Sequence, residues 1–248
     1  VDIIPRFSMN TSFADIEKKE NRKDLIISIC VFLSGFSCFA QLYYFQPLLP
    51  DLAKDFILSA SESSFAISFS TLGMVFGLFT TMFVADRIPR KKMIGTGLLS
   101  SSIFSVAASF SPTFLPLILL SAAKGFLLSG ATSVSMAYIA EEVSSRNKGK
   151  IMGLYIAGNA LGGMAGRVIS SWIGALYTWR IASVSIGLIC ALFAILFLLF
   201  SPRSTNFMPR KESFHTLIIA NLQLITSKAL IPFYLTGGLI LGLSLIHI

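Results

Sequence analysis

Two cationic residues stand inside long apolar runs, where a charged side chain is costly to bury. Lys124 lies in the run 114–139 and Arg167 in the run 151–176. Each is about nine or ten residues from the same end of its run, which places both on the order of 14 Å below a membrane surface if the runs are helical. A charge at that depth costs roughly 2.5 to 3.5 kcal/mol on insertion scales, so ionisable residues there are functional candidates. The alternative is that the two side chains extend outward to the surface, which strains them from this depth.

Polar side chains accompany these cations at helical spacing. Asn159 shares a face with Arg167, while Gln41 and Tyr44 form a polar stripe in the first apolar run, with Gln41 at about the same depth. Stripes that converge on one level predict one wall of an aqueous cavity for an anionic or hydroxyl-rich solute. No acidic residue lies deep in the first six apolar runs, so a carboxylate partner for the cations is expected elsewhere in the protein. Hydrogen bonding between helices is the alternative role of such stripes.

The composition predicts that these residues lie in a membrane. The chain has 248 residues, of which 54% are hydrophobic and 13% charged, and its mean hydropathy is +0.76. Soluble domains are roughly 45 to 50% apolar and 25% charged. The net charge of +8 is spread between apolar runs instead of gathered on one face, which argues against a nucleic-acid partner. Cys30, Cys38 and Cys190 lie in apolar runs without a CxxC or Cys/His cluster, so no disulfide, metal or cofactor is predicted.

Six apolar runs organise the chain into an all-α integral membrane protein. They cover 25–50, 65–85, 93–110, 114–139, 151–176 and 181–200, which are lengths suited to helices that cross a bilayer. We therefore expect a flexible cytoplasmic lead at 1–24, a six-span unit at 25–200, a cytoplasmic loop at 201–228 and the start of a second unit at 229–248. Because the sequence stops within this seventh apolar run, we interpret it as a truncated part of a longer protein.

The basic residues predict the orientation of these spans. Sixteen of the 20 Lys and Arg residues lie before the first run or in the segments on the same side of the membrane, and two lie on the other side. Short loops rich in Lys and Arg face the cytoplasm. We expect a multi-pass protein of the plasma (inner) membrane with its amino terminus in the cytoplasm.

The loop 86–92 is one of these basic segments, with one acid followed by four cations. It resembles the loop motif of the major facilitator superfamily between the second and third spans. The matching residues are Asp86, Arg87, Arg90 and Lys91, while Met82 and Pro89 replace the two glycines of that motif. The resemblance implies a transporter of two six-span halves, each built from inverted three-span repeats.

The same resemblance implies a cytoplasmic gate. Asp86 would dock against the positive end of a helix in the second half of the protein, which is therefore an expected partner. Arg87 and Arg90 would pair with Asp86 or with Glu141 and Glu142 at the inner end of the fourth span. The alternative is a solvated loop whose charges only set the topology.

The fifth apolar run carries a second resemblance, to the antiporter motif of the superfamily. Four glycines keep its spacing, with Gly163 in place of the motif's proline and Arg167 in place of its last glycine; they are Gly149, Gly158, Gly162 and Gly166. Close packing of helices is the alternative reason for small residues at this spacing. The wider blocks 136–142 and 153–164 resemble bacterial arabinose and drug efflux permeases.

These observations predict a secondary transporter and not an enzyme. We expect proton-coupled efflux of a small solute (a sugar, a metabolite or a drug) by alternating access in the lipid bilayer. Two alternatives remain: a membrane scaffold or receptor of the same fold that does not transport, and a six-span unit that dimerises. A membrane enzyme would need embedded His or carboxylate clusters, and His215 and His247 both lie outside the six runs.

Overall fold

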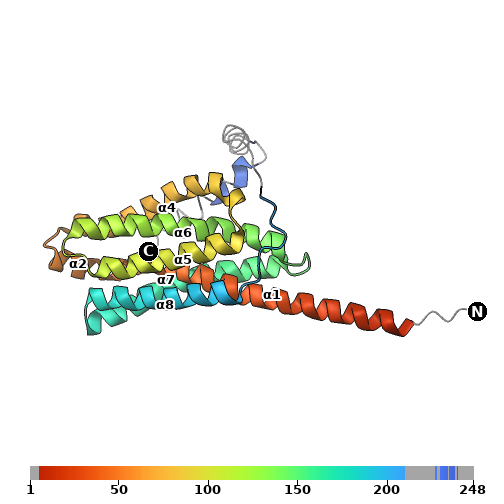
Figure 1. Ribbon diagram of the computed structural model, residues 1–248. Helices are drawn as coiled ribbons and strands as arrows, with labels where there is room; N and C mark the ends of the chain where they lie inside the picture. Colours follow the sequence, from red (N-terminus) through yellow and green to blue (C-terminus); the bar gives the residue numbers. More distant parts are fainter. Residues whose placement is uncertain (1–5, 210–226, 228–229, 234, 238, 240–248) are drawn as a thin grey trace, which may run out of the picture. The chain divides into compact units, whose positions relative to one another are not determined.

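The computed structural model describes residues 6–209, 227, 230–233, 235–237 and 239 (Figure 1). Six long helices account for most of this part of the chain: α1 (Arg6–Tyr43), α4 (Phe65–Val84), α5 (Arg90–Ser109), α6 (Phe114–Glu142), α7 (Lys148–Leu176) and α8 (Trp179–Phe200). Short helical turns join them: η1 (Gln46–Leu48), α2 (Leu49–Asp55), α3 (Ala60–Ser63) and η2 (Ala85–Arg87). The described residues contain no strand, as the all-α prediction requires.

Each of the six predicted apolar runs corresponds to one long helix, and the ends agree within a few residues for all but α1. Four helical stretches are long and apolar enough to cross a membrane, namely Lys18–Asp55, Ala60–Arg87, Phe114–Glu142 and Trp179–Phe200. The helices α5 and α7 are as long but less apolar, because α5 begins with three cations and carries many serines, and α7 is rich in glycine. Buried serines can satisfy their hydroxyls on the helix's own carbonyls, as Ser102 Oγ does by donating to Leu98 O at 2.8 Å.

The first helix differs from its prediction at both ends. The lead 1–24 was expected to be flexible, but α1 is helical from Arg6 and runs without a break into the first span. Figure 1 shows the amino-terminal turns of α1 continuing past the ends of the other helices. At the other end α1 stops at Tyr43 and not near Pro50. Pro47 and Pro50 instead occupy the first turns of η1 and α2, where a missing backbone N–H leaves no hydrogen bond unmade.

The helices of residues 6–209 pack in pairs that are not all neighbours in sequence. The main pairs are α4 with α6, α1 with α7, and α5 with both α6 and α8. Glycine permits close approaches in these pairs: a Cβ at Gly125 of α6 would overlap the carbonyl oxygen of Ser70 in α4, and one at Gly158 of α7 would lie 2.6 Å from that of Phe32 in α1. Gly162 and Gly166 face the backbone of α1 in the same way, whereas Gly149 has no atom of another element within 4 Å.

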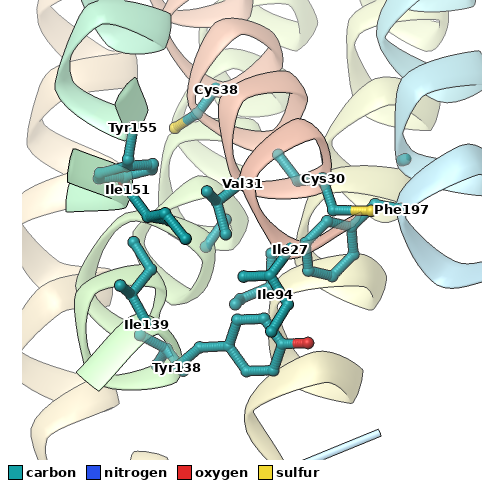
Figure 2. Packing of buried hydrophobic residues seen from close by; sticks show 14 of the residues in the cluster. Ile27, Cys30, Val31, Cys38, Ile94, Tyr138, Ile139, Ile151, Tyr155 and Phe197 are labelled. Carbon is teal, nitrogen blue, oxygen red and sulfur yellow. The ribbon is translucent and has the colours of Figure 1, made fainter. Parts of the chain in front are cut away.

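Two clusters of buried apolar side chains hold the bundle together. One joins α1, α5, α6, α7 and α8 near the end of the bundle at which α5 begins and includes Ile27, Ile94, Tyr138, Ile151 and Phe197. Figure 2 shows these side chains converging between the helices. The other cluster lies toward the opposite end, around Tyr44, Leu52 and Trp179. The three cysteines are buried and unpaired within these clusters.

Candidate transport site and gate

Lys124 lies inside the bundle, with only 1% of its surface exposed. Its Nζ sits 4.6 Å from the ring centroid of Tyr44 and 4.8 Å from that of Phe45, the two residues directly after α1. Within the described part of the chain, the amine has no hydrogen-bond partner and no carboxylate within ion-pair distance. The ring faces attract a cation but do not replace hydrogen bonds. Lys124 is therefore a buried polar group that lacks partners in this arrangement.

Other polar atoms around this position are also incompletely paired. Gln41 is fully buried, and its Oε1 accepts a hydrogen bond of 3.1 Å from Ser105 Oγ of α5. The amide Nε2 of Gln41 and the hydroxyl of Ser121, one turn before Lys124, have no partner among the described residues. Buried polar groups are usually satisfied, and those that are not point to an unseen ligand, water or ion. Of the predicted cavity residues, Lys124 lies against the ring of Tyr44 and Gln41 contacts Ser105 of α5, and all three are buried in the bundle interior.

Arg167 and Asn159 occupy a different seam, between α7 and α1. The guanidinium of Arg167 is half-buried and lies 4.6 Å from the ring centroid of Tyr43, and its Nε has no partner in the part of the chain that the structure describes. The side-chain oxygen of Asn159 lies against Gly35 of α1. Consecutive residues on a helix point about 100° apart. Tyr43 and Tyr44 therefore face different neighbours, and the single polar wall expected from the sequence is divided into two positions.

Arg90 is the centre of an ion-pair network at the end of the bundle where α5 begins. It donates to Asp86 Oδ1 at 2.9 Å and to Glu141 Oε1 at 3.0 Å, and its Nη1 also donates to the carbonyl of Ala85 at 2.6 Å. Only 10% of the Arg90 side chain is exposed. The guanidinium thus joins the loop after α4 to the end of α6. Three of the five predicted gate residues, Asp86, Arg90 and Glu141, are brought together here.

A hollow of about 600 Å³ lies beside this network, between α4 and α6. Asp86 and Arg90 line one end of it, and the rest of its lining is mainly apolar: Val75, Leu78, Phe79, Met82, Ala85, Val134 and Ala137, with Thr81 and Ser133. An apolar hollow with an ion pair at its rim has the size and chemistry to receive a few side chains of another helix.

The other two predicted gate residues have different surroundings. Glu142 is buried and does not contact the arginines; it accepts hydrogen bonds from Lys23 Nζ at 2.8 Å and from the Asn206 backbone at 2.7 Å. It also accepts one from the Thr205 hydroxyl at 2.8 Å. Arg87 is exposed and forms no ion pair with any residue that the structure describes. Of the partners expected for the two arginines, Asp86 and Glu141 pair with Arg90, whereas Glu142 pairs with Lys23 of α1 instead.

The end of the bundle where α5 begins contains further contacts that sequence reasoning missed. Asp24 is buried and accepts hydrogen bonds from Ser144 Oγ at 2.5 Å and Asn147 Nδ2 at 2.8 Å, so it fastens α1 to the loop after α6. The hydroxyl of Tyr138 donates to the carbonyl of Pro202 at 2.8 Å. The partners are separated by more than 60 residues of sequence, so no local sequence pattern predicts these hydrogen bonds. The one sequence feature that could have indicated a role for Asp24 is its position directly after the cations Arg22 and Lys23.

One cation, Arg180, connects the helices at the opposite end of the bundle. Arg180 donates to Asp55 Oδ2 at 3.0 Å and to the carbonyls of Ser109 and Ser111 at 2.8 and 3.0 Å, while Trp179 Nε1 donates to the same Asp55 oxygen at 2.9 Å. A guanidinium over the last carbonyls of a helix satisfies acceptors that lack an intrahelical partner. Arg180 therefore ties α2, α5 and α8 together.

Comparisons with a family model and with curated proteins all point to membrane transporters. The family model described as Major Facilitator Superfamily matches residues 28–247. An uncharacterized transporter of Buchnera aphidicola subsp. Schizaphis graminum is 35% identical over 92% of this chain and 55% of its own length. The inner membrane transport protein YnfM of Escherichia coli K12 is 34% identical over 87% of this chain and 51% of its own length. The chain thus spans about half the length of the curated relatives it matches.

Solved structures resemble the helical arrangement. The proton:xylose symporter XylE, bound to 6-bromo-6-deoxy-D-glucose, matches with a TM-score of 0.68 at 16% identity, over 85% of this chain and 51% of that chain. The human organic anion transporter MFSD10 matches with a TM-score of 0.61 at 18% identity, over 78% of this chain and 52% of that chain. At these identities the likeness concerns the fold alone.

Proposed function

Because the chain belongs to the major facilitator superfamily, we propose that its protein is a secondary transporter that exports a small solute in exchange for protons by alternating access. The predicted fold class, an all-α membrane protein of this superfamily, is confirmed by the family match and the likeness to solved transporters. Transport itself, its outward direction, the coupling to protons and the class of solute are the proposal.

The surroundings of Lys124 carry this proposal. Its amine lies inside the apolar part of the bundle, touches the faces of two aromatic rings and has no hydrogen-bond partner among the described residues. A buried charge without a counterion is costly, so three events would each relieve it: arrival of a solute anion, arrival of a carboxylate from elsewhere in the protein, or loss of the proton. A group that gains and loses such a partner as access alternates can link proton movement to solute movement.

Arg167 supports the class of solute. Its guanidinium is half-buried over the ring of Tyr43, and Asn159 lies on the same helix two turns earlier. A planar guanidinium binds carboxylate or phosphate groups in two places at once and also donates to hydroxyls. We propose that Arg167 and Asn159 contact an anionic or hydroxyl-rich solute at the seam of α1 and α7.

The Arg90 network supports alternating access. Arg90 and Asp86 line the hollow between α4 and α6, and Arg90 pairs with both Asp86 and Glu141. We propose that a helix from the second half of the protein seats in this hollow and that its positive end faces Asp86, which closes the cytoplasmic side. Opening would then require that helix to leave the ion-pair network.

The test is solute flux in vesicles that contain the protein. Labelled sugars and organic acids would be offered to everted vesicles with an imposed pH gradient, and uptake would be compared with and without a protonophore. We expect at least one solute to accumulate only while the gradient is present. Lys124→Met should abolish this accumulation, whereas Lys150→Met, which removes an exposed amine on α7, should not. Accumulation by the Lys124→Met protein equal to that of the parent would rule out the role of Lys124.

One observation favours a second candidate. The hollow between α4 and α6 would also accept a helix from a second copy of the chain, as a unit that dimerises or a scaffold without transport would require. Vesicles that move none of the solutes, together with cross-linking of Met82→Cys between two copies, would support this candidate over the exporter.

A further inference from the structure

A second groove lies on the bundle away from the transport site, between α4, α5 and α6. We propose that it binds one anionic phospholipid from the leaflet on the side of the loop 86–92, with an acyl chain in the groove and the headgroup phosphate at Arg87 and Lys92. This site goes beyond transport and does not depend on it, because none of its residues belongs to the Lys124 or Arg167 positions.

The groove consists of two hollows that meet at shared residues. The first has a volume of about 280 Å³ and the second about 460 Å³, and Phe126 and Leu127 of α6 line both. The other lining residues of the first are Gly77, Thr80, Thr81, Val84, Ile88, Met93, Thr96, Gly97, Ser100 and Gly130; those of the second are Gly73, Phe76, Phe104, Ala122 and Ala123. Glycines of three helices leave space where side chains would otherwise stand. The groove therefore extends from the loop 86–92 along the apolar part of the helices.

The walls of this groove suit an acyl chain. The rings of Phe76 and Phe126 are 61% and 41% exposed, so the groove opens on an apolar surface that faces its environment. Lipid tails are as apolar as these side chains, so the hydrophobic effect alone does not hold one lipid there. A hollow still favours a chain that fills it, because an empty hollow deprives its lining atoms of van der Waals contacts. Selectivity for one kind of lipid must then come from the headgroup.

The charges at the mouth of the groove supply this selectivity. Ile88 and Met93 line its end, and the residues beside them in sequence, Arg87 and Lys92, are exposed. Neither side chain forms a hydrogen bond or ion pair with the residues that the structure describes, whereas Arg90 in the same loop is held by Asp86 and Glu141. Two free cations at the end of an apolar groove complement a phosphate at the end of an acyl chain. Each basic residue near a membrane surface strengthens binding of anionic lipid about fivefold.

Competition between two lipids tests the headgroup contact. The purified protein in detergent would receive equal amounts of phosphatidylglycerol and phosphatidylcholine with the same acyl chains, and the bound lipid would be counted by native mass spectrometry. We expect one phosphatidylglycerol to be retained in preference to phosphatidylcholine. The double variant Arg87→Gln with Lys92→Gln should lower this preference about 25-fold, since two charges are lost. The exposed Lys54 lies at the other end of the bundle, so Lys54→Gln should leave the preference unchanged.

Two threonines of α4 provide a matched test of the groove. Thr80 lines the first hollow, while Thr71 lines neither hollow of the groove; both are exposed, and each donates its hydroxyl to the carbonyl four residues earlier. Thr80→Phe should fill the hollow and reduce retained phosphatidylglycerol several-fold, and Thr71→Phe should not.

Four results would each overturn the proposal. They are no retained lipid on the parent chain, an unchanged preference in the charge variant, an equal loss with Thr80→Phe and Thr71→Phe, and displacement of the lipid by free glycerol phosphate at the same concentration. The last result would mean that the cations bind a phosphate without any use of the groove.

Discussion

Replacing Lys124 with methionine should make the protein more stable. The side chain keeps its length but loses the amine, which has no hydrogen-bond partner in the described part of the chain. A buried group left unsatisfied costs about 1 to 3 kcal/mol, with charged groups at or above the upper end. Loss of the cation's attraction to the rings of Tyr44 and Phe45 removes about 2 kcal/mol of stabilisation. Contact of the methionine sulfur with the same rings restores about 1 kcal/mol.

The balance is a gain of about 2 kcal/mol, which corresponds to a rise in Tm of about 4 to 8 °C for a protein of this size. Thermal unfolding followed by circular dichroism in detergent, at one scan rate, would measure it. The matched control is Lys150→Met, which removes an exposed amine and should change the stability by less than about 0.5 kcal/mol.

The opposite sign would refute the reasoning. If Lys124→Met lowers Tm by several degrees while Lys124→Arg does not, the cation at this position has a counterion in the folded protein. The amine could then not be the unpaired group on which the proposed transport site rests. An increase in Tm together with a loss of solute flux would instead identify Lys124 as a residue kept for function at a cost in stability.

Two further changes test the packing of the bundle. Gly162→Leu should destabilise the protein by about 1 to 3 kcal/mol, because a side chain there would collide with the backbone of Phe36; thermal unfolding would measure the loss, and Gly153→Leu, with nothing within 4 Å, is the control. Glu142→Gln should speed amide hydrogen exchange at Asn206 about 10- to 100-fold, since the hydrogen bond from that amide would lose its charged acceptor; unchanged exchange would mean that the segment after α8 is held by its other contacts.

The number and position of the helices could be predicted from the sequence. Each of the six apolar runs became one long helix whose ends lie within a few residues of those expected, apart from α1. Such runs predict helices well because a segment in a bilayer must form all its backbone hydrogen bonds internally. An apolar stretch of sufficient length therefore folds as a helix. The extension of α1 to Arg6 was not predicted, because a polar segment gives no periodic signal of this kind.

The candidate site was predicted in part. The depth of Lys124 and Arg167 was expected from counting residues along a helix, and the pairing of Arg90 with Asp86 was expected from the resemblance of the loop 86–92 to the superfamily's motif. The pairing of Glu142 with Lys23 does not follow from either. It joins residues 119 positions apart, and it depends on which face of α1 is turned toward the end of α6.

The sequence by itself determined that the chain is helical and that it belongs in a membrane. It also determined at which ends of the helices the basic residues gather, and which polar residues lie deep among apolar ones. These features depend on composition and on the fixed rise of a helix. Only the tertiary structure decided which of those residues meet. Tyr43 and Tyr44 are adjacent in sequence, yet one covers Arg167 of α7 and the other covers Lys124 of α6. Neighbouring positions on a helix diverge by about 100°, so the packing of α1 against two different helices separates two cations that the sequence places at the same depth.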